Sequence, residues 1–328
     1  MRCVRYGRNT VNRNRTVDRR TFLRTTATAS LFASTALGAE PASVDSGASA
    51  FRYIDVHTHI TQPWGEKPAL SAAELVRWMD KAEIGKAFVL PLVNPESWDH
   101  LITVEYVLRE TAPHRDRLVA SCCIDPRANY LNSFEAKVKH LKRNLDAGVK
   151  GYGEHKCGVN IDDPRNIEVF AAAAELKLPI LFHLDNDRNM DTPGLPGLAR
   201  ALEAVPNGVF IGHANGWWAS ISGDATQEDF GAYPNRKTAP GGAIDALMDR
   251  FPNLYGDLSA GSGSNAILRD IEFGREFLTR RADRLLFGTD YLMPGQQVPQ
   301  LSTYREIELP EDAQRKIFRE NAQRLFGV

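Results

Sequence analysis

The sequence contains a small set of histidines and carboxylates whose spacing suits metal chemistry. His57 and His59 lie two residues apart at the end of a short apolar run, and this spacing places both side chains on one face of a strand. Glu154 and Lys156 show the same spacing at the end of another such run. Three more candidates end or follow apolar runs: His183, His213 and Asp290. Imidazole and carboxylate groups together suit zinc or a related divalent ion with an open coordination position.

These residues need a scaffold that brings the ends of several strands together. Short apolar runs bounded by Gly, Pro or Asn predict buried parallel strands at residues 51–57, 86–92, 117–124, 148–154, 179–184, 208–213, 253–259 and 284–289. Segments with helical periodicity alternate with them, at residues 71–83, 97–112, 131–146, 164–177, 195–205, 241–251, 264–281 and 311–326. Two helix starts carry capping signals, Ser71 three residues before Glu74 and Asp163 before Pro164.

Eight strand–helix units predict an α/β fold, a single (β/α)8 TIM barrel over residues 51–328. An open doubly wound sheet is the alternative, because alternation alone does not establish closure. In a barrel the carboxyl ends of the strands meet at one rim, so the candidate residues converge there. Each has a structural alternative as a core, loop or capping residue, and Glu154 could simply pair with Lys156. Four of the 8 histidines fall at the ends of only three strands, which favours a metal site.

The connection between residues 216 and 240 is long for a compact domain and directly follows the sixth predicted strand. Its position favours a lid or a binding loop. Trp217 and Trp218, at its beginning, could stack on a sugar or aromatic ring of the substrate, or could pack beneath the lid. Both interpretations stay open at this level.

The N-terminal segment has a different composition from the rest of the chain. Residues 1–24 contain eight arginines and one acid, with Arg19-Arg20-Thr21-Phe22-Leu23, before an uncharged stretch from Thr25 to Gly38. This order resembles a twin-arginine export signal. We therefore expect a cleaved signal peptide at residues 1–39, a linker at 40–50, recognition by the twin-arginine export machinery, and a periplasmic or extracellular location. The alternative is a basic tail.

The remaining chain is acidic, since residues 40–328 carry 32 basic and 40 acidic side chains, a net charge of −8. This charge argues against non-specific binding to nucleic acid. Cys122, Cys123 and Cys157 lie in apolar surroundings and are odd in number, so we expect core residues and not a disulfide framework.

The ordered motifs resemble those of the amidohydrolase superfamily. They are Asp55-Val-His57-Thr-His59, then His183, Gly-His213-Ala, Phe-Gly-Thr-Asp290 and a final Asn321-Ala-x-Arg-Leu-Phe. More narrowly, the chain is similar to the amidohydrolase-related branch of metal-dependent TIM-barrel hydrolases, over residues 51–328. The resemblance implies one or two divalent ions, commonly zinc.

The resemblance also implies roles for the individual residues. His57, His59 and Asp290 would bind the metal. In members with one ion His183 completes the site and His213 acts as an acid or base, whereas in members with two ions both histidines bind the second. The strand-four position holds Glu154, which we favour as a ligand.

Lys156, two residues further on, is expected to face an anionic substrate. The expected reaction is hydrolysis of a small lactone, ester or amide by a metal-activated water, with Asp290 accepting its proton. One alternative is a lyase that decarboxylates or hydrates an aromatic or unsaturated acid. A less favoured one is a secreted barrel that binds without turnover. Oligomers through the barrel helices are compatible with the sequence.

Overall fold

The computed structural model describes residues 52–62, 68–97 and 101–328. The predicted signal peptide and linker lie outside these residues. Within them, no helix has the length and apolar character needed to cross a bilayer.

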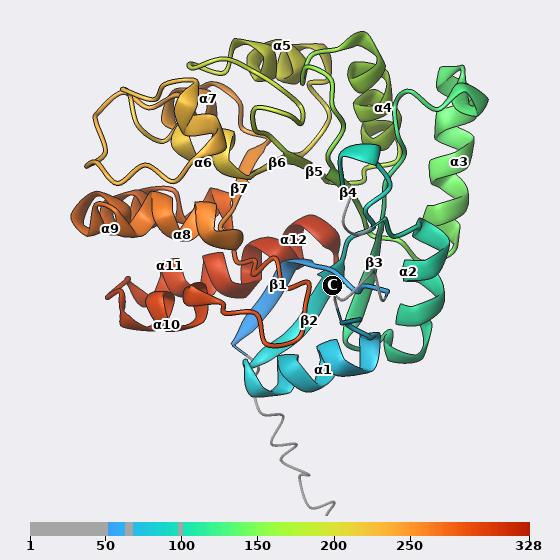
Figure 1. Ribbon diagram of the computed structural model, residues 1–328, viewed down its shortest axis with the longest axis horizontal. Helices are drawn as coiled ribbons and strands as arrows, with labels where there is room; N and C mark the ends of the chain where they lie inside the picture. The colour runs from blue at the N-terminus through green and yellow to red at the C-terminus, as the bar shows by residue number, and fades with distance from the viewer. Residues whose placement is uncertain (1–51, 63–67, 98–100) are drawn as a thin grey trace, which may run out of the picture. The chain divides into compact units, whose positions relative to one another are not determined.

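Eight parallel strands form one sheet in which every strand pairs with its neighbour in the sequence (Figure 1). They are β1 (Tyr53–Thr58), β2 (Ile84–Val89), β3 (Leu118–Cys122), β4 (Gly151–His155), β5 (Ile180–His183), β6 (Phe210–His213), β7 (Leu254–Asp257) and β8 (Leu285–Leu286). All eight overlap the predicted runs. Because parallel strands need long crossovers, helices occupy the connections and cover the outside of the sheet.

The two edges of the sheet meet, so the structure is a barrel and not an open sheet. The Val56 N–H donates to the Phe287 carbonyl at 3.0 Å, and the His59 N–H donates to the Tyr291 carbonyl at 2.9 Å. Thr58 also forms an isolated parallel bridge with Tyr291. The prediction of an α/β TIM barrel is confirmed.

The helices follow the predicted order with some differences, one of which is the unpredicted short helix α6 (Asn215–Ala219). They are α1 (Ala72–Lys81), α2 (Val104–Thr111), α3 (Phe134–Asp146), α4 (Pro164–Glu175), α5 (Pro196–Ala204), α6 (Asn215–Ala219), α7 (Ala243–Arg250), α8 (Ala260–Leu268), α9 (Ile271–Arg280), α10 (Pro299–Glu306), α11 (Glu311–Arg315) and α12 (Asn321–Phe326). The single helix expected at 264–281 is two helices, α8 and α9. Helix α10 was not predicted, and a π-helical turn at Lys316–Glu320 joins α11 to α12.

Both predicted capping signals are present. The Ser71 hydroxyl accepts the Glu74 N–H at 3.2 Å while the Glu74 carboxylate accepts the Ser71 N–H at 2.9 Å. Asp163 accepts the Arg165 N–H at 2.9 Å at the start of α4.

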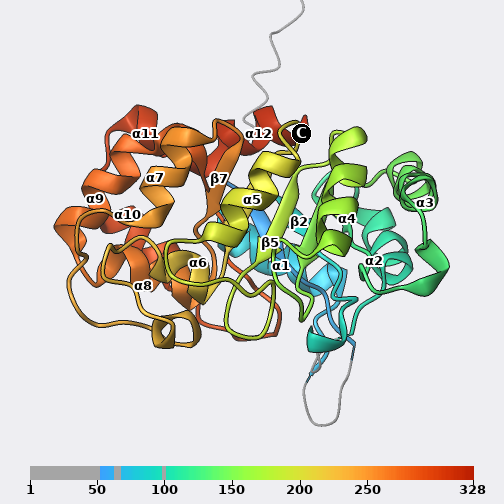
Figure 2. The same ribbon diagram turned by 90° about the horizontal axis from the view of Figure 1, so that it is seen from above.

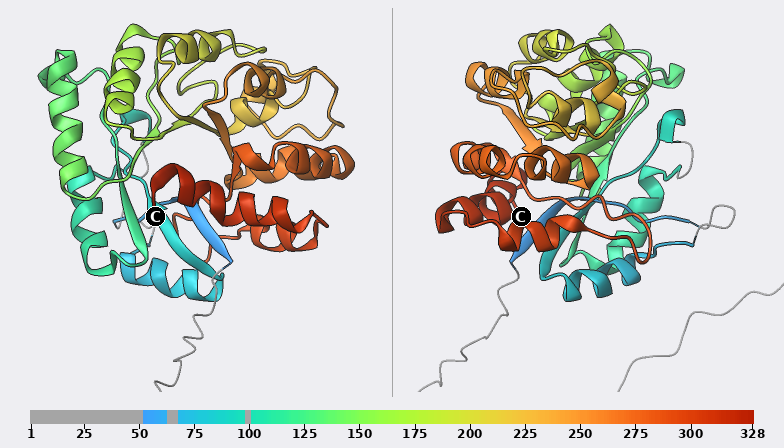
Figure 3. Two further views of the ribbon diagram at one scale, coloured as in Figure 1. Left: turned by 180° about the vertical axis from the view of Figure 1, so that it is seen from behind. Right: turned by 60° about the vertical axis from the view of Figure 1, so that its left-hand side comes forward.

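The barrel interior is filled by apolar side chains from the strands, among them Val56, Phe88, Leu181 and Ile211. Helix α12 lies at one end of the barrel (Figures 1 and 3). It contributes Phe326, whose ring centroid is 4.2 Å from that of Phe88. The connections that carry α6 and α8 lie at the other end, where the strands finish (Figure 2). The interior is therefore a packed core, and only the carboxyl ends of the strands are left for chemistry.

Cys122, Cys123 and Cys157 are free and buried, as expected.

Candidate metal centre

The structure brings the predicted donors together at the carboxyl ends of the strands. His57 lies in β1 and His59 directly follows this strand. Glu154 belongs to β4, His183 ends β5, His213 ends β6, and Asp290 follows β8. Among the described residues, three groups of three have ligand atoms within 4.8 Å of one another: His57, His59 and Asp290; Glu154, His183 and His213; and His57, His213 and Asp257.

The imidazoles of His57 and His59 face each other through their Nε2 atoms at 3.1 Å. The other nitrogen of each ring is already used, because His57 Nδ1 contacts Asp257 Oδ2 at 2.7 Å and His59 Nδ1 contacts the Leu90 carbonyl at 2.9 Å. A carbonyl and an ionised carboxylate only accept hydrogen bonds, so both Nδ1 atoms donate. Two Nε2 lone pairs this close repel each other, so either a proton or a metal ion lies between them.

The carboxylates complete a donor set of suitable size. Asp290 Oδ1 lies 3.4 Å from His57 Nε2 and 3.3 Å from His59 Nε2. Glu154 Oε2 lies 3.8 and 3.6 Å from the same two nitrogens. Ligand atoms about 2.0–2.2 Å from a tetrahedral ion are about 3.3–3.6 Å apart. The donors therefore match a four-coordinate divalent ion in chemistry and in separation.

Asp55 connects the end of β1 to the loop that carries Asp290. Its carboxylate accepts the Thr289 hydroxyl at 2.6 Å, the Thr289 N–H at 3.1 Å and the His57 N–H at 3.0 Å. Asp290 itself has a positive φ of 55°, a conformation that aspartate tolerates better than most residues, and its N–H donates to the His57 carbonyl at 2.8 Å. These bonds fix Asp290 beside His57.

The site has an excess of negative charge. Burial lowers the pKa of His57, but Asp290 and Asp257 raise it by more, so that it lies well above its ordinary value. For Asp290, burial raises the pKa while His57 and His59 lower it by more, to about 2. The carboxylates are thus ionised and favour a positive charge at the Nε2 atoms. A divalent cation bound between these groups would neutralise the same negative charge.

The residues of the site differ in their exposure. His57, His59, Glu154 and His213 are at most 1% exposed, whereas Lys156 is 19% and Asp290 22% exposed at their side chains. Together with His183, which is 13% exposed, Lys156 and Asp290 are the predicted site residues that solvent reaches.

His183 lies between two carboxylates. Its Nδ1 is 2.7 Å from Glu154 Oε1 and its Nε2 is 2.8 Å from Asp185 Oδ2. Asp185 also accepts Arg188 Nη1 at 2.6 Å. This hydrogen-bonded row runs from the buried Glu154 outward to Arg188.

Lys156 and Trp217 differ in their relation to the site. The Lys156 ammonium donates to Glu154 Oε2 at 3.1 Å, so the pairing that was one alternative for these residues is present. Trp217 is fully buried, its ring packed edge-on against Phe182 with a centroid distance of 6.0 Å. No face of this ring is free for a substrate. Of the two interpretations of Trp217, the structure therefore favours packing over stacking on a substrate. Trp217 lies in α6, at the start of the 216–240 connection, which also contains a short 3-10 turn, Glu228–Gly231.

Three polar residues of the site were not singled out from the sequence, namely Asp185, Asp257 and Ser259. Asp257 ends β7, so its position at the end of an apolar run is a signal that could have found it. In the structure Ser259 and Asp185 lie in connections. Ser259 nevertheless ends the predicted run 253–259, two residues after Asp257, so the spacing that indicated His57 and His59 could have found this pair as well.

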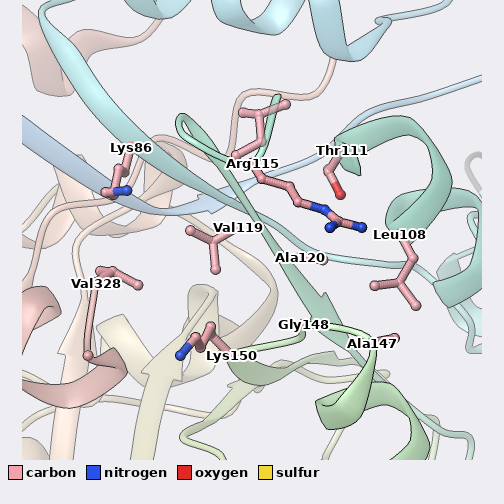
Figure 4. A pocket seen from close by; sticks show the side chains of 12 residues that line it. Lys86, Leu108, Thr111, Arg115, Val119, Ala120, Ala147, Gly148, Lys150 and Val328 are labelled. Atoms are coloured by element: carbon pink, nitrogen blue, oxygen red, sulfur yellow. The ribbon is translucent and has the colours of Figure 1, made fainter. Parts of the chain in front are cut away.

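A separate cavity of about 290 Å³ lies between α2, β3 and the C-terminus (Figure 4). Lys86, Arg115 and Lys150 are among its lining residues. None of the predicted site residues lines this cavity, so it is distinct from the metal centre.

A TIM barrel that gathers histidines and carboxylates at the carboxyl ends of its strands defines the class of metal-dependent barrel enzymes. The chain belongs to the amidohydrolase family, whose model matches residues 54–328. It is accordingly an enzyme of the amidohydrolase type, and the binding barrel without turnover is not favoured. No curated protein matches the chain by sequence.

Solved structures share this fold at low sequence identity. An uncharacterised TIM-barrel protein from Bordetella bronchiseptica is 16% identical with a TM-score of 0.60, covering 84% of this chain and 98% of its own. A proposed 2-pyrone-4,6-dicarboxylic acid hydrolase from Pseudomonas putida is 13% identical with a TM-score of 0.57 and coverages of 84% and 98%. A variant 5-carboxyvanillate decarboxylase from Novosphingobium aromaticivorans, with bound manganese, is 12% identical with a TM-score of 0.51 and coverages of 86% and 99%.

Proposed function

We propose that the protein is a metal-dependent hydrolase that cleaves a small lactone, ester or amide. The observation that carries this proposal is the close approach of four donors at the barrel mouth. The Nε2 atoms of His57 and His59 lie 3.1 Å apart and 3.3–3.8 Å from carboxylate oxygens of Glu154 and Asp290. When bound there, a divalent ion supplies a Lewis acid and lowers the pKa of water toward neutrality.

Three residues of the chain account for proton transfer and substrate binding in this proposal. Asp290 is ionised, partly exposed and beside the donors, so it is placed to accept the proton of the attacking water. His213 lies on the other side of Glu154, with its Nε2 3.9 Å from Glu154 Oε1, and serves as an acid or base. Lys156, which is partly exposed, holds an anionic group of the substrate.

The position of Glu154 is compatible with one ion or two. Its Oε2 faces His57 and His59, while its Oε1 faces His183 and His213. A carboxylate with one oxygen toward each group of donors is the arrangement that a bridging ligand needs. We propose zinc as the ion. Manganese is the first metal to compare with zinc, because a structural neighbour contains it.

The experiment measures metal per chain by elemental mass spectrometry and follows products of lactones, esters and amides in ¹⁸O-labelled water. Hydrolysis places ¹⁸O in the product acid. Asp290→Asn should keep the fold and lose most activity, and Glu154→Gln should lower the metal content if two ions are bound. Near-normal turnover by Asp290→Asn would contradict the role of Asp290.

A second candidate is a lyase acting on an aromatic or unsaturated carboxylic acid. Lys156 and Arg188 favour it, because two cations near the mouth suit a substrate carboxylate, and a decarboxylase is among the structural neighbours. Release of carbon dioxide, or addition of water across a double bond, without ester or amide cleavage would establish this reaction in place of the first.

We also propose that residues 1–39 are a twin-arginine signal, so that the mature enzyme is exported. The family match begins only at residue 54, after the arginine-rich segment. Replacing Arg19 and Arg20 with lysine should retain the unprocessed chain in the cytoplasm. Normal export of that variant would refute the signal.

A further inference from the structure

We propose that Asp257 and Ser259 are positioning residues that hold His57 and His213 with Nδ1 as the hydrogen donor and Nε2 directed to the metal cavity. This inference rests on the proposed metal-binding role of the two histidines. It concerns residues that touch no metal, and it follows from counting hydrogen-bond donors and acceptors around Asp257.

The Asp257 carboxylate acts only as a hydrogen-bond acceptor, and both of its oxygens are used. Oδ1 accepts the Ser259 N–H at 3.0 Å. Oδ2 accepts His57 Nδ1 at 2.7 Å and the Ser259 hydroxyl at 2.7 Å. Asp257 and Ser259 are both fully buried, so water does not compete for these bonds.

Ser259 extends the same control to His213. Its hydroxyl has one proton, which goes to Asp257 because a carboxylate cannot donate. The 2.9 Å contact between Ser259 Oγ and His213 Nδ1 must then be a hydrogen bond that His213 donates. His213 Nδ1 also lies 3.2 Å from Asp257 Oδ2. With Nδ1 protonated, the lone pair of neutral His213 is on Nε2, toward Glu154.

His57, His213 and Asp257 form a group of potential ligands themselves, since they have donor atoms within 4.8 Å of one another. The Ser259 hydroxyl lies against all three, 3.2 Å from His57 Nδ1 in addition to the contacts above. His57 Nδ1, His213 Nδ1 and Asp257 Oδ2 are therefore all engaged in hydrogen bonds to one another or to Ser259. We therefore interpret this group as a hydrogen-bonded cluster that orients the two histidines, and not as a second ion site.

A carboxylate at position 257 is required, because asparagine has only one acceptor oxygen. If that oxygen takes the place of Oδ2, the amide NH2 faces the Ser259 N–H, donor against donor. If it takes the place of Oδ1, the NH2 faces His57 Nδ1, which must then accept. His57 Nε2 would carry the proton and point it into the cavity, where it blocks coordination.

The test compares the metal-loaded wild-type chain with Asp257→Asn, Ser259→Ala and the exposed control Asp146→Asn. Cobalt(II) affinity is measured by chelator competition together with the visible absorption of the bound ion. Zinc-loaded, ¹⁵N-histidine-labelled protein reports the Nδ1–H protons by NMR. Loss of a carboxylate behind a metal-binding histidine typically weakens metal binding about 10–100-fold. We expect this loss for Asp257→Asn, with disappearance of the His57 Nδ1–H signal, and no change for Asp146→Asn.

Ser259→Ala should leave the His57 signal in place, lose or shift the His213 signal, and weaken cobalt binding less than Asp257→Asn. Cobalt affinity of Asp257→Asn within threefold of wild type, or an unchanged His57 signal, would overturn the role of Asp257. If Asp257→Asn does not fold, an unchanged His213 signal in Ser259→Ala overturns the proposal instead. A wild-type chain that binds neither cobalt nor zinc refutes the proposed function, while the Nδ1–H signals of that chain still test the hydrogen bonds separately.

Discussion

Metal removal should destabilise the barrel by an amount that depends on the free metal concentration. Without an ion, the Nε2 atoms of His57 and His59 stay 3.1 Å apart next to the carboxylates of Asp290 and Glu154, whose pKa values are lowered. The unfolded chain loses this convergence of donors, so the ion binds mainly the folded state. A ligand of the folded state stabilises it by about 2.7 kcal/mol at 100 times its Kd and about 4.1 kcal/mol at 1,000 times.

For a domain of this size, 1 kcal/mol corresponds to about 2 °C in Tm. Raising buffered free zinc from well below the Kd to 100 times the Kd should therefore raise the Tm by about 5 °C. Differential scanning calorimetry of the full chain at several buffered zinc concentrations measures this shift. His59→Ala removes one donor and should lose most of the shift, whereas His114→Ala, outside the site, should retain it.

The reasoning would be refuted if the Tm of the wild-type chain did not change with zinc or manganese. It would also fail if His59→Ala showed the full shift, because the ion would then bind elsewhere.

Three further predictions concern the rest of the barrel. Gly212→Ala should lower the free energy of unfolding in urea by about 1–3 kcal/mol, because a Cβ there would lie closer than 3.0 Å to the buried Trp217 ring. An unchanged urea midpoint would show that the ring can move. Burial raises the pKa of Cys122 to about 12, so alkylation at pH 8 followed by mass spectrometry should find this thiol unmodified until the chain is denatured. Hydrogen bonds from Arg236 hold the pKa of Asp229 well below its usual value, so this pair stabilises the fold at neutral pH and loses its effect as the pH falls below about 4. Arg236→Gln should thus cost up to about 1 kcal/mol at pH 7 and less at pH 3, and an equal cost at both would contradict the ion pair.

The strands and most of the site were accessible from the sequence because each depends on a local pattern. An apolar run followed by histidine marks the end of a parallel strand, and closure of the barrel then brings His57, His183 and His213 to one rim. The direction of a side chain in a connection has no such pattern. The sequence therefore left Trp217 open between stacking on a substrate and packing in the core.

The break between α8 and α9 was missed for a related reason. Helical periodicity continues across residues 264–281, and nothing in the sequence of apolar residues marks the end of a helix at Leu268. Asp257 could have been found, since it ends a strand as clearly as His213 does. The hydrogen bonds that give it a role depend on three strands meeting in space.

The contribution of α12 to the barrel interior bears on when the protein can finish folding during its synthesis. Phe326 packs on Phe88 from 238 positions later in the chain, and its ring also lies against Gly151. A ribosome adds about 5–20 residues per second, so β1 to β4 exist for many seconds before α12 can join them. During this time the interior side chains at the amino-terminal end of these strands are not yet covered by α12. Chaperone binding to nascent chains should therefore persist until the last helix has emerged.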